Sequence, residues 1–186
     1  MRPGVRVSGG ELRGRALEVP PGARPTEGRL REALFSIWRE RVAGARFLDL
    51  FAGSGAVGLE AASRGALRVV CVDGDLRAVR AIAGNVSRLG KGLAEVRRLT
   101  LPAGLVRLAS EGPFDLIFAD PPYRFSDHAA LLAAAAPLLA EEGEIAVEHS
   151  TRTELPAEVG SLLRVDVRRY GESSLSFYRL RYDSRA

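Results

Sequence analysis

The stretch FLDLFAGSG, residues 47–55, decides the fold of this chain. It begins as an apolar run interrupted only by Asp49, which is typical of a buried strand. Glycines at 53 and 55 then open a turn before residues 56–64 take up helical periodicity. Glycine allows the backbone to pass close under a ligand, and in parallel sheets such ligands lie at the carboxyl ends of the strands. The stretch therefore predicts a strand, turn and helix of an α/β protein, with a ligand above the turn.

The acidic residue in this stretch narrows the class of ligand. Residues 53–58 match the letters of the G-x-G-x-x-G dinucleotide pattern, but Asp49 lies four residues before the first glycine. A carboxylate at that place suits a cationic amino-acid ligand better than a pyrophosphate, and S-adenosylmethionine is such a ligand. We expect this part of the cofactor to be bound by Asp49, Ala52, Gly53, Ser54 and Gly55.

A second strand, VVCVD at residues 69–73, also ends in an acid. Asp73 is placed where a carboxylate accepts hydrogen bonds from both hydroxyls of a ribose. The alternative is that Asp73 and Asp75 serve only as turn and helix-cap residues.

A third motif, IFADPPY at residues 117–123, carries the chemistry. An exocyclic amine on a base is a poor nucleophile because its lone pair is delocalised into the ring. The side chain of Asp120 and the carbonyl of Pro121, freed from regular pairing by Pro122, can accept its two N–H bonds and aim the lone pair at a methyl donor. Tyr123 would stack on the base. The motif looks like that of amino-group methyltransferases, with Asp120 also next to the cofactor. A strand stopped by a Pro-Pro turn is the alternative.

The order of these motifs resembles the class I methyltransferases, and the amino-terminal part resembles one family among them. VRVSGG (residues 5–10), RGR (13–15) and RPT (24–26), followed by Arg29 and REALF (31–35), are similar to the signature of the RsmD family of bacterial 16S ribosomal RNA guanine-N2 methyltransferases. The resemblance covers nearly the whole chain. It implies a Rossmann-like, mostly parallel seven-stranded sheet closed by a C-terminal antiparallel hairpin. It also implies methyl transfer from S-adenosylmethionine to N2 of a guanine in the 16S RNA of the small subunit.

Two segments depart from the family pattern. Glu27-Gly28 stands where a threonine or serine and an aspartate commonly precede the arginine corresponding to Arg29. After the third strand, residues 96–104 lack the acidic or amide residue that the family usually places near the adenine ring, and Thr100 is the hydrogen-bonding group that could replace it.

Positive charge is concentrated in the amino-terminal part. Residues 1–48 contain ten arginines and five glutamates, a net charge of +5, against +4 for the whole chain. Because phosphate contacts dominate nucleic-acid affinity, this part is expected to bind the RNA backbone. The predicted RNA-binding residues are Arg6, Arg13, Arg15, Arg24, Thr26 and Arg29. The chain has 26 arginines and one lysine, so finding arginine in place of lysine at any one position carries little information. The concentration of arginines in the amino-terminal part is not explained by this overall preference.

The remaining elements follow from periodicity. We expect two parts, a basic β-hairpin arm over 1–22, made of a two-stranded ribbon within 4–20, and a methyltransferase domain over 23–186. A helix is predicted to begin near Thr26 and to bury Trp38 on its apolar face. Further elements are predicted by range: a helix at 127–140, a strand at 144–148, and a closing pair of strands at 162–168 and 175–182.

Composition indicates a compact cytoplasmic enzyme, expected to be a monomer. Cys71 lies in an apolar strand and is expected to be a buried, inert thiol. His128 and His149 are too far apart in sequence to suggest a metal site, and no membrane span or leader is expected.

Three other functions compete with this interpretation. A DNA adenine-N6 methyltransferase shares the Asp-Pro-Pro-Tyr motif, but such enzymes generally add a target-recognition segment. A protein-glutamine methyltransferase would more typically carry Asn at the first motif position. A non-catalytic RNA-binding module on the same fold is disfavoured because Asp49, Gly53, Gly55, Asp73 and residues 120–123 are all intact.

Overall fold

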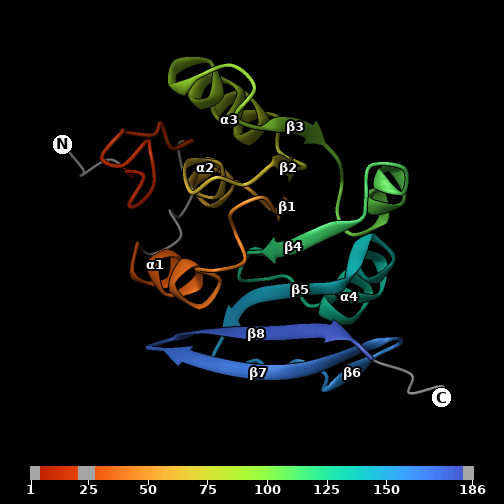
Figure 1. Cartoon of the computed structure of the whole chain (residues 1–186). Helices are drawn as coiled ribbons and strands as arrows, with labels where there is room; N and C mark the ends of the chain where they lie inside the picture. The colour runs from red at the N-terminus through yellow and green to blue at the C-terminus, as the bar shows by residue number, and fades with distance from the viewer. Residues whose placement is uncertain (1–4, 21–27, 182–186) are drawn as a thin grey trace.

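The computed structural model describes residues 5–20 and 28–181. Its centre is one sheet of eight strands in the order β3-β2-β1-β4-β5-β8-β7-β6 (Figure 1). The strands through β5 pair in parallel, and the last three pair antiparallel. Their bounds are β1 Arg46–Leu50, β2 Arg68–Asp73, β3 Glu95–Arg98, β4 Phe114–Ala119, β5 Leu139–Ser150, β6 Glu158–Val159, β7 Leu162–Tyr170 and β8 Ser173–Leu180.

Helices cover both faces of the sheet. Those on one face are α1 (Gly28–Ile37), α2 (Ala56–Ser63) and α3 (Leu76–Leu89), and those on the other are the short helix η1 (Ala103–Leu108) and α4 (His128–Ala135), which continues into η2 (Ala136–Leu138) (Figure 1). This arrangement confirms the predicted α/β class.

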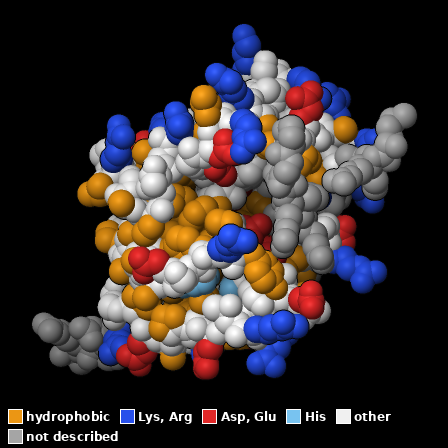
Figure 2. Space-filling model, turned by 180° about the vertical axis from the view of Figure 1, so that it is seen from behind, with side chains coloured by type: hydrophobic (Ala, Val, Ile, Leu, Met, Phe, Trp, Pro, Cys, Tyr) orange, Lys and Arg blue, Asp and Glu red, His pale blue; other side chains and the backbone are white. Residues whose placement is uncertain are grey.

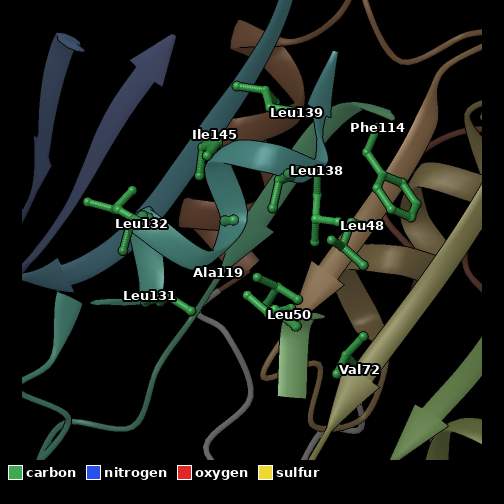
Figure 3. Close-up of a cluster of buried hydrophobic side chains, with 14 of the residues drawn as sticks. Leu48, Leu50, Val72, Phe114, Ala119, Leu131, Leu132, Leu138, Leu139 and Ile145 are labelled. Carbon is green, nitrogen blue, oxygen red and sulfur yellow. The ribbon is translucent and has the colours of Figure 1, made fainter. Parts of the chain in front are cut away.

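Alternating side chains of the strands build two separate cores. Leu48 and Leu50 of β1 face α4 and η1, where they meet Leu131 and other aliphatic residues (Figure 3). Phe47, one residue earlier, faces α1 and packs edge-on against Trp38 at 5.9 Å between ring centroids. Since strand side chains alternate between faces, a central strand covered on both sides must be apolar throughout. Asp49 is therefore an exception to the apolar composition of this buried strand.

The last third of the chain differs from the prediction in detail. The helix expected over 127–140 ends at Ala135, because Pro137 has no N–H to continue an α-helix and the chain passes into η2. Strand β5 is longer than the expected 144–148, and β6 adds an eighth strand of two residues to the expected seven. The closing antiparallel pair, β7 and β8, is confirmed.

The amino-terminal segment pairs as the expected antiparallel ribbon over only a few residues. A bridge joins Arg6 and Ala16, and it is flanked by backbone hydrogen bonds of 3.0 Å from Val7 N to Arg15 O and of 2.8 Å from Leu17 N to Val5 O. Val7 and Leu17 are buried against Leu59 of α2. The segment therefore lies on the α2 side of the sheet as a packed part of the molecule.

Helix α1 supports the predicted core. Leu30, Leu34 and Trp38 are buried, and the indole Nε1 of Trp38 donates to Glu144 Oε1 at 2.7 Å. The assignment of Trp38 to the core is confirmed. Thr26, predicted as the helix cap, and Arg24 lie outside the described residues.

The cysteine occupies the interior, as predicted. Cys71 is fully buried, and burial raises the pKa of its thiol well above the ordinary value. Within residues 5–20 and 28–181, no helix is long and apolar enough to cross a membrane, and no group of three or more His, Cys, Asp or Glu side chains could hold a metal ion.

Candidate active site

The three sequence motifs meet at one edge of the sheet. Strands β2, β1 and β4 are parallel neighbours, so their carboxyl ends, with Asp73, Phe51 and Asp120, lie side by side. Two backbone bonds extend the pairing beyond the strands: Ala52 N donates to Val72 O at 3.0 Å, and Asp120 N donates to Leu50 O at 3.2 Å. Residues far apart in sequence thus form one cluster.

The glycine-rich turn after β1 is tightly fitted. Gly55 has φ of 78°, and a Cβ there would lie 3.1 Å from Ile82 Cγ2 of α3. Gly58, in the first turns of α2, is closer still to its surroundings, because a Cβ would lie 2.5 Å from Cys71 Sγ. These glycines allow α2 to sit directly on β1 and β2 and to bring the turn against the edge of the sheet.

Asp49 lies beneath this turn rather than on its surface. It is 1% exposed, and its Oδ2 accepts a hydrogen bond of 2.9 Å from the N–H of Gly58. Burial raises the pKa of Asp49 to about 8, the Gly58 bond opposes that shift, and the nearby Asp120 and Asp73 add to it. The predicted contact of Asp49 with the cofactor stays a prediction; the structure shows a buried carboxyl group that lies near two further acids, Asp73 and Asp120.

Asp73 joins the two turns. Its Oδ2 accepts from Gly53 N and its Oδ1 from Asp75 N, both at 2.9 Å. Asp75 is the N-cap of α3, with its side chain accepting from Arg77 N at 2.8 Å. The alternative roles, turn and cap, are therefore present for both residues. Because an ionised carboxylate has about four acceptor positions, half-buried Asp73 retains capacity for the predicted ribose hydroxyls.

A pocket of about 480 Å³ adjoins Asp73 at the ends of β2 and β3. Gly74, Leu99 and Thr100 are among its lining residues, together with Gly104 of η1. A Cβ on Gly74 would lie 3.4 Å from Leu99 O, so the residue after β2 packs close to the backbone after β3. Thr100, the predicted hydrogen-bonding group for an adenine, is exposed beside this pocket.

The Asp-Pro-Pro-Tyr segment leaves the sheet where β4 ends at Ala119. Its turn is closed by a 2.7 Å hydrogen bond from Phe125 N to Pro122 O. The ring of Phe125 packs edge-on against Phe51, with centroids 5.4 Å apart, so this turn touches the residue that precedes the glycine-rich turn. Phe51 has φ of 58°, which a bulky side chain rarely adopts, and the contact contributes to holding it there.

Tyr123 projects from this turn. Its side chain is 68% exposed, and its hydroxyl lies 3.4 Å from Ser150 Oγ at the end of β5. Among the predicted catalytic residues, Pro121 is buried, Asp120 is half-buried, and Pro122 is exposed. The exposed ring of Tyr123 is compatible with the predicted stacking, which no contact in the structure tests.

The predicted RNA-binding residues lie on the amino-terminal side. Arg6, Arg13, Arg15 and Arg29 are exposed, although Arg6 also donates to Gly14 O at 2.7 Å. The neighbouring Arg31 is different, because it is buried and its Nε lies 3.1 Å from Glu60 Oε2.

Glu60 of α2 is itself fully buried. It accepts hydrogen bonds from the backbone and the hydroxyl of Ser8 and from Arg64. Sequence patterns did not indicate this buried network, which ties the amino-terminal segment to α2.

Known proteins are similar to this chain over most of its length. The family model described as Conserved hypothetical protein 95 matches residues 5–179. The Ribosomal RNA small subunit methyltransferase D of Escherichia coli (strain K12) is 38% identical over 159 residues, which are 84% of this chain and 77% of that protein. This chain belongs to the RsmD family. The protein YlbH of Bacillus subtilis (strain 168) is 36% identical over 183 residues, covering 95% of this chain and all of YlbH.

Solved structures agree with the RsmD assignment. A hypothetical protein of Thermus thermophilus superposes with a TM-score of 0.81 at 39% identity, covering 95% of this chain and 99% of that one. The Escherichia coli protein yhhF gives the same TM-score at 32% identity, covering 97% of this chain and all of that one. The resemblance to the RsmD family and the expected class I methyltransferase fold are both confirmed.

Proposed function

We propose that this chain transfers a methyl group from S-adenosylmethionine to the exocyclic N2 amine of a guanine in 16S ribosomal RNA. The proposal includes its setting: the protein works in the cytoplasm as a monomer, on RNA within a small-subunit particle. The observation that carries it is the position of Asp120-Pro121-Pro122-Tyr123, directly beside the glycine-rich turn and the acids at the ends of β1 and β2. RsmD relatives that carry the name of a small-subunit RNA methyltransferase support the choice of substrate.

The residues at the ends of β1 and β2 fit a cationic ligand. Asp49, Asp73 and Asp120 are close enough for their charges to raise the pKa of Asp49, so a cation among them would relieve their mutual repulsion. S-adenosylmethionine carries a sulfonium and an ammonium group, and when bound it supplies the electrophilic methyl. The turn from Ala52 to Gly55, with Asp49 below it, would bind the amino-acid end; Asp73 would accept the ribose hydroxyls, and the pocket beside Gly74 and Thr100 would take the adenine.

The residues after β4 would hold the acceptor. Asp120 Oδ and the carbonyl of Pro121 would each accept one N–H of the guanine amine, which directs its lone pair at the methyl group. The ring of Tyr123 would stack on a base that has been unpaired or extruded, since a base inside a helix cannot bring its amine into line. With the methyl group supplied by the bound cofactor, the amine held by Asp120 and Pro121 would form the new C–N bond as the C–S bond of the donor breaks, and it would release one proton to solvent.

The arginines at 6, 13, 15, 24 and 29, with Thr26, would contact the RNA from the amino-terminal side. Deleting residues 1–20 should lower the salt dependence of RNA binding; because Val7 and Leu17 are part of the packed molecule, substitution of Arg13 and Arg15 to Gln is the gentler test.

The deciding experiment is the transfer of labelled methyl to unmodified small subunits, naked 16S RNA and duplex DNA in parallel, followed by identification of the nucleoside. N2-methylguanosine in ribosomal RNA is the expected product. N6-methyladenine in DNA would show that the proposed substrate is wrong and that methylation of an exocyclic amine is right. Cofactor binding without transfer to any of these acceptors would favour the non-catalytic alternative.

A further inference from the structure

Three arginines lie along the same edge of the sheet as Tyr123, on the side away from the amino-terminal segment. Arg124 follows Tyr123 directly, and Arg152 follows the end of β5 by two residues. Arg169, in β7, pairs with Ser174 of β8, which in turn pairs with His149 of β5. The carboxyl ends of β4 and β5 and the adjoining end of β7 therefore each present one arginine.

The loops that carry these arginines are connected to one another. Ser150 Oγ accepts a hydrogen bond of 3.2 Å from Arg152 N and lies 3.4 Å from the hydroxyl of Tyr123. Thr151 N donates to Glu172 O at 2.9 Å, in the turn between β7 and β8. His149 supports the same region, since its Nε2 lies 2.8 Å from Ser176 Oγ. The edge is thus a continuous rim built from three strands.

The arginines of this rim differ from three other exposed arginines, which are in ion pairs. Arg77, Arg168 and Arg181 are in ion pairs with Asp75, Asp166 and Glu158. Over residues 5–20 and 28–181, the salt bridges include none from Arg124, Arg152 or Arg169, all of which are exposed.

The carboxylates nearest in sequence do not cancel these charges. Asp127 accepts from Ala130 N as the cap of α4, and Asp166 is paired with Arg168. Glu154 and Glu172 are exposed, and neither is in a salt bridge with the rim arginines within the described part of the chain.

The face on which histidine side chains are visible has apolar surface at its centre, with Lys and Arg side chains spread around it (Figure 2).

We propose that Arg124, Arg152 and Arg169 form a second site for the RNA backbone, binding phosphates next to the nucleotide that stacks on Tyr123. The inference rests on the proposed function, because it takes RNA as the substrate. A base that leaves its stack displaces the phosphates on both sides of it, and charge on one side alone does not fix them. The amino-terminal arginines lie on the α2 side of the site, and this rim lies on the β5 side. The RNA strand would then pass between two basic surfaces of the protein, and Tyr123 lies between these surfaces.

The test measures the affinity for naked 16S RNA as a function of salt concentration for the unchanged protein, for each single Arg→Gln variant of the rim, and for the triple variant. Each phosphate contact that is lost should reduce the slope of log K against log salt by roughly 0.7 to 0.9, so the slope of the triple variant should fall by roughly 2.1 to 2.7. Affinity for S-adenosylmethionine should not change. Arg39→Gln is the matched control, because Arg39 is exposed and follows α1 at the opposite edge, before β1 begins.

The outcomes separate this inference from the proposed function. Suppose that the unchanged protein methylates 16S RNA and that the triple variant has the same salt slope as Arg39→Gln. The proposal that the rim binds RNA would then be wrong, and the proposed function would stand. A reduced slope in a protein that methylates no RNA would support the rim and overturn the function. Thermal unfolding of every variant near that of the unchanged protein is required, and is expected for exposed side chains.

Discussion

The two halves of the carboxyl edge of the sheet are built in opposite ways. At the ends of β1 and β2, Asp49 is 1% exposed and Asp73 is bonded to two backbone N–H groups, so the ligand groups are fixed before any ligand arrives. At the ends of β4 and β5, Tyr123 is 68% exposed and Arg124 and Arg152 extend into solvent. A small cofactor benefits from a preorganised site, whereas a large RNA needs exposed groups that meet it on a surface. The difference supports the proposed division, in which the first half binds the cofactor and the second half binds RNA.

The largest expected effect comes from the residue at the junction of these halves. Asp120→Ala should reduce the rate of methyl transfer by at least about a hundredfold, because the amine loses the acceptor that orients it, while the protein still binds the cofactor. Single-turnover transfer and calorimetry measure the two quantities. Asp120→Asn keeps an oxygen acceptor and should retain more activity than Ala. Unchanged turnover in Asp120→Ala would remove the basis of the proposed mechanism.

Tyr123 tests the exposed half alone. Stacking on a base contributes about 1–3 kcal/mol, so Tyr123→Ala should lower kcat/KM for RNA by roughly fivefold to a hundredfold. Tyr123→Phe keeps the ring and should lose much less, and neither variant should change KM for the cofactor. Equal losses in Ala and Phe would show that the hydroxyl, rather than the ring, is what matters.

Gly58 tests the packed half. In the variant Gly58→Ala the added methyl group would meet Cys71 Sγ, and overpacking of this kind destabilises the folded state by about 1–3 kcal/mol. The midpoint of thermal unfolding should fall by roughly 2 °C or more for a chain of this size. Gly84→Ala in α3 is the control, because no atom lies within 4 Å of its Cβ position and alanine favours a helix. If both variants unfolded at the same temperature, the close contact at Gly58 would not be limiting.

Asp49 should make the stability of the protein depend on pH. Its pKa in the folded protein is about 8 against an ordinary 3.8, so the folded state retains a proton that the unfolded state has lost. Its contribution to stability is therefore fully present below the ordinary value and is lost as pH rises towards 8. Urea unfolding between pH 5 and 9 should show this decline, and Asp49→Asn should lack it.

Cofactor binding should oppose this titration. Positive charge near Asp49 lowers its pKa, so a proton is released on binding and affinity for S-adenosylmethionine should rise several-fold from about pH 6.5 to about pH 8.5. Calorimetry in two buffers of different ionisation enthalpy measures the released proton. An equal pH dependence in Asp49→Asn would assign the effect to another group.

Most of the parallel strands, the glycine-rich turn and the Asp-Pro-Pro-Tyr motif can be predicted from sequence, because hydrophobic periodicity and turn residues are local properties of neighbouring positions. The apolar strand before Asp120 and the closing hairpin were found in this way. The prediction was wrong in extent where local signals compete: Pro137 ends a helix that alanine and leucine would continue, and the amino-terminal ribbon pairs over fewer residues than expected.

The packing of segments that are distant in sequence is seen only in the tertiary structure. The sequence places Asp49 near a ligand, but its burial under α2 follows from the close approach that Gly58 permits. The network around Glu60 joins residues more than fifty positions apart, and the rim of Arg124, Arg152 and Arg169 forms because β4, β5 and β7 end at the same edge. No local pattern carries such information, since these contacts depend on the order of strands in the sheet.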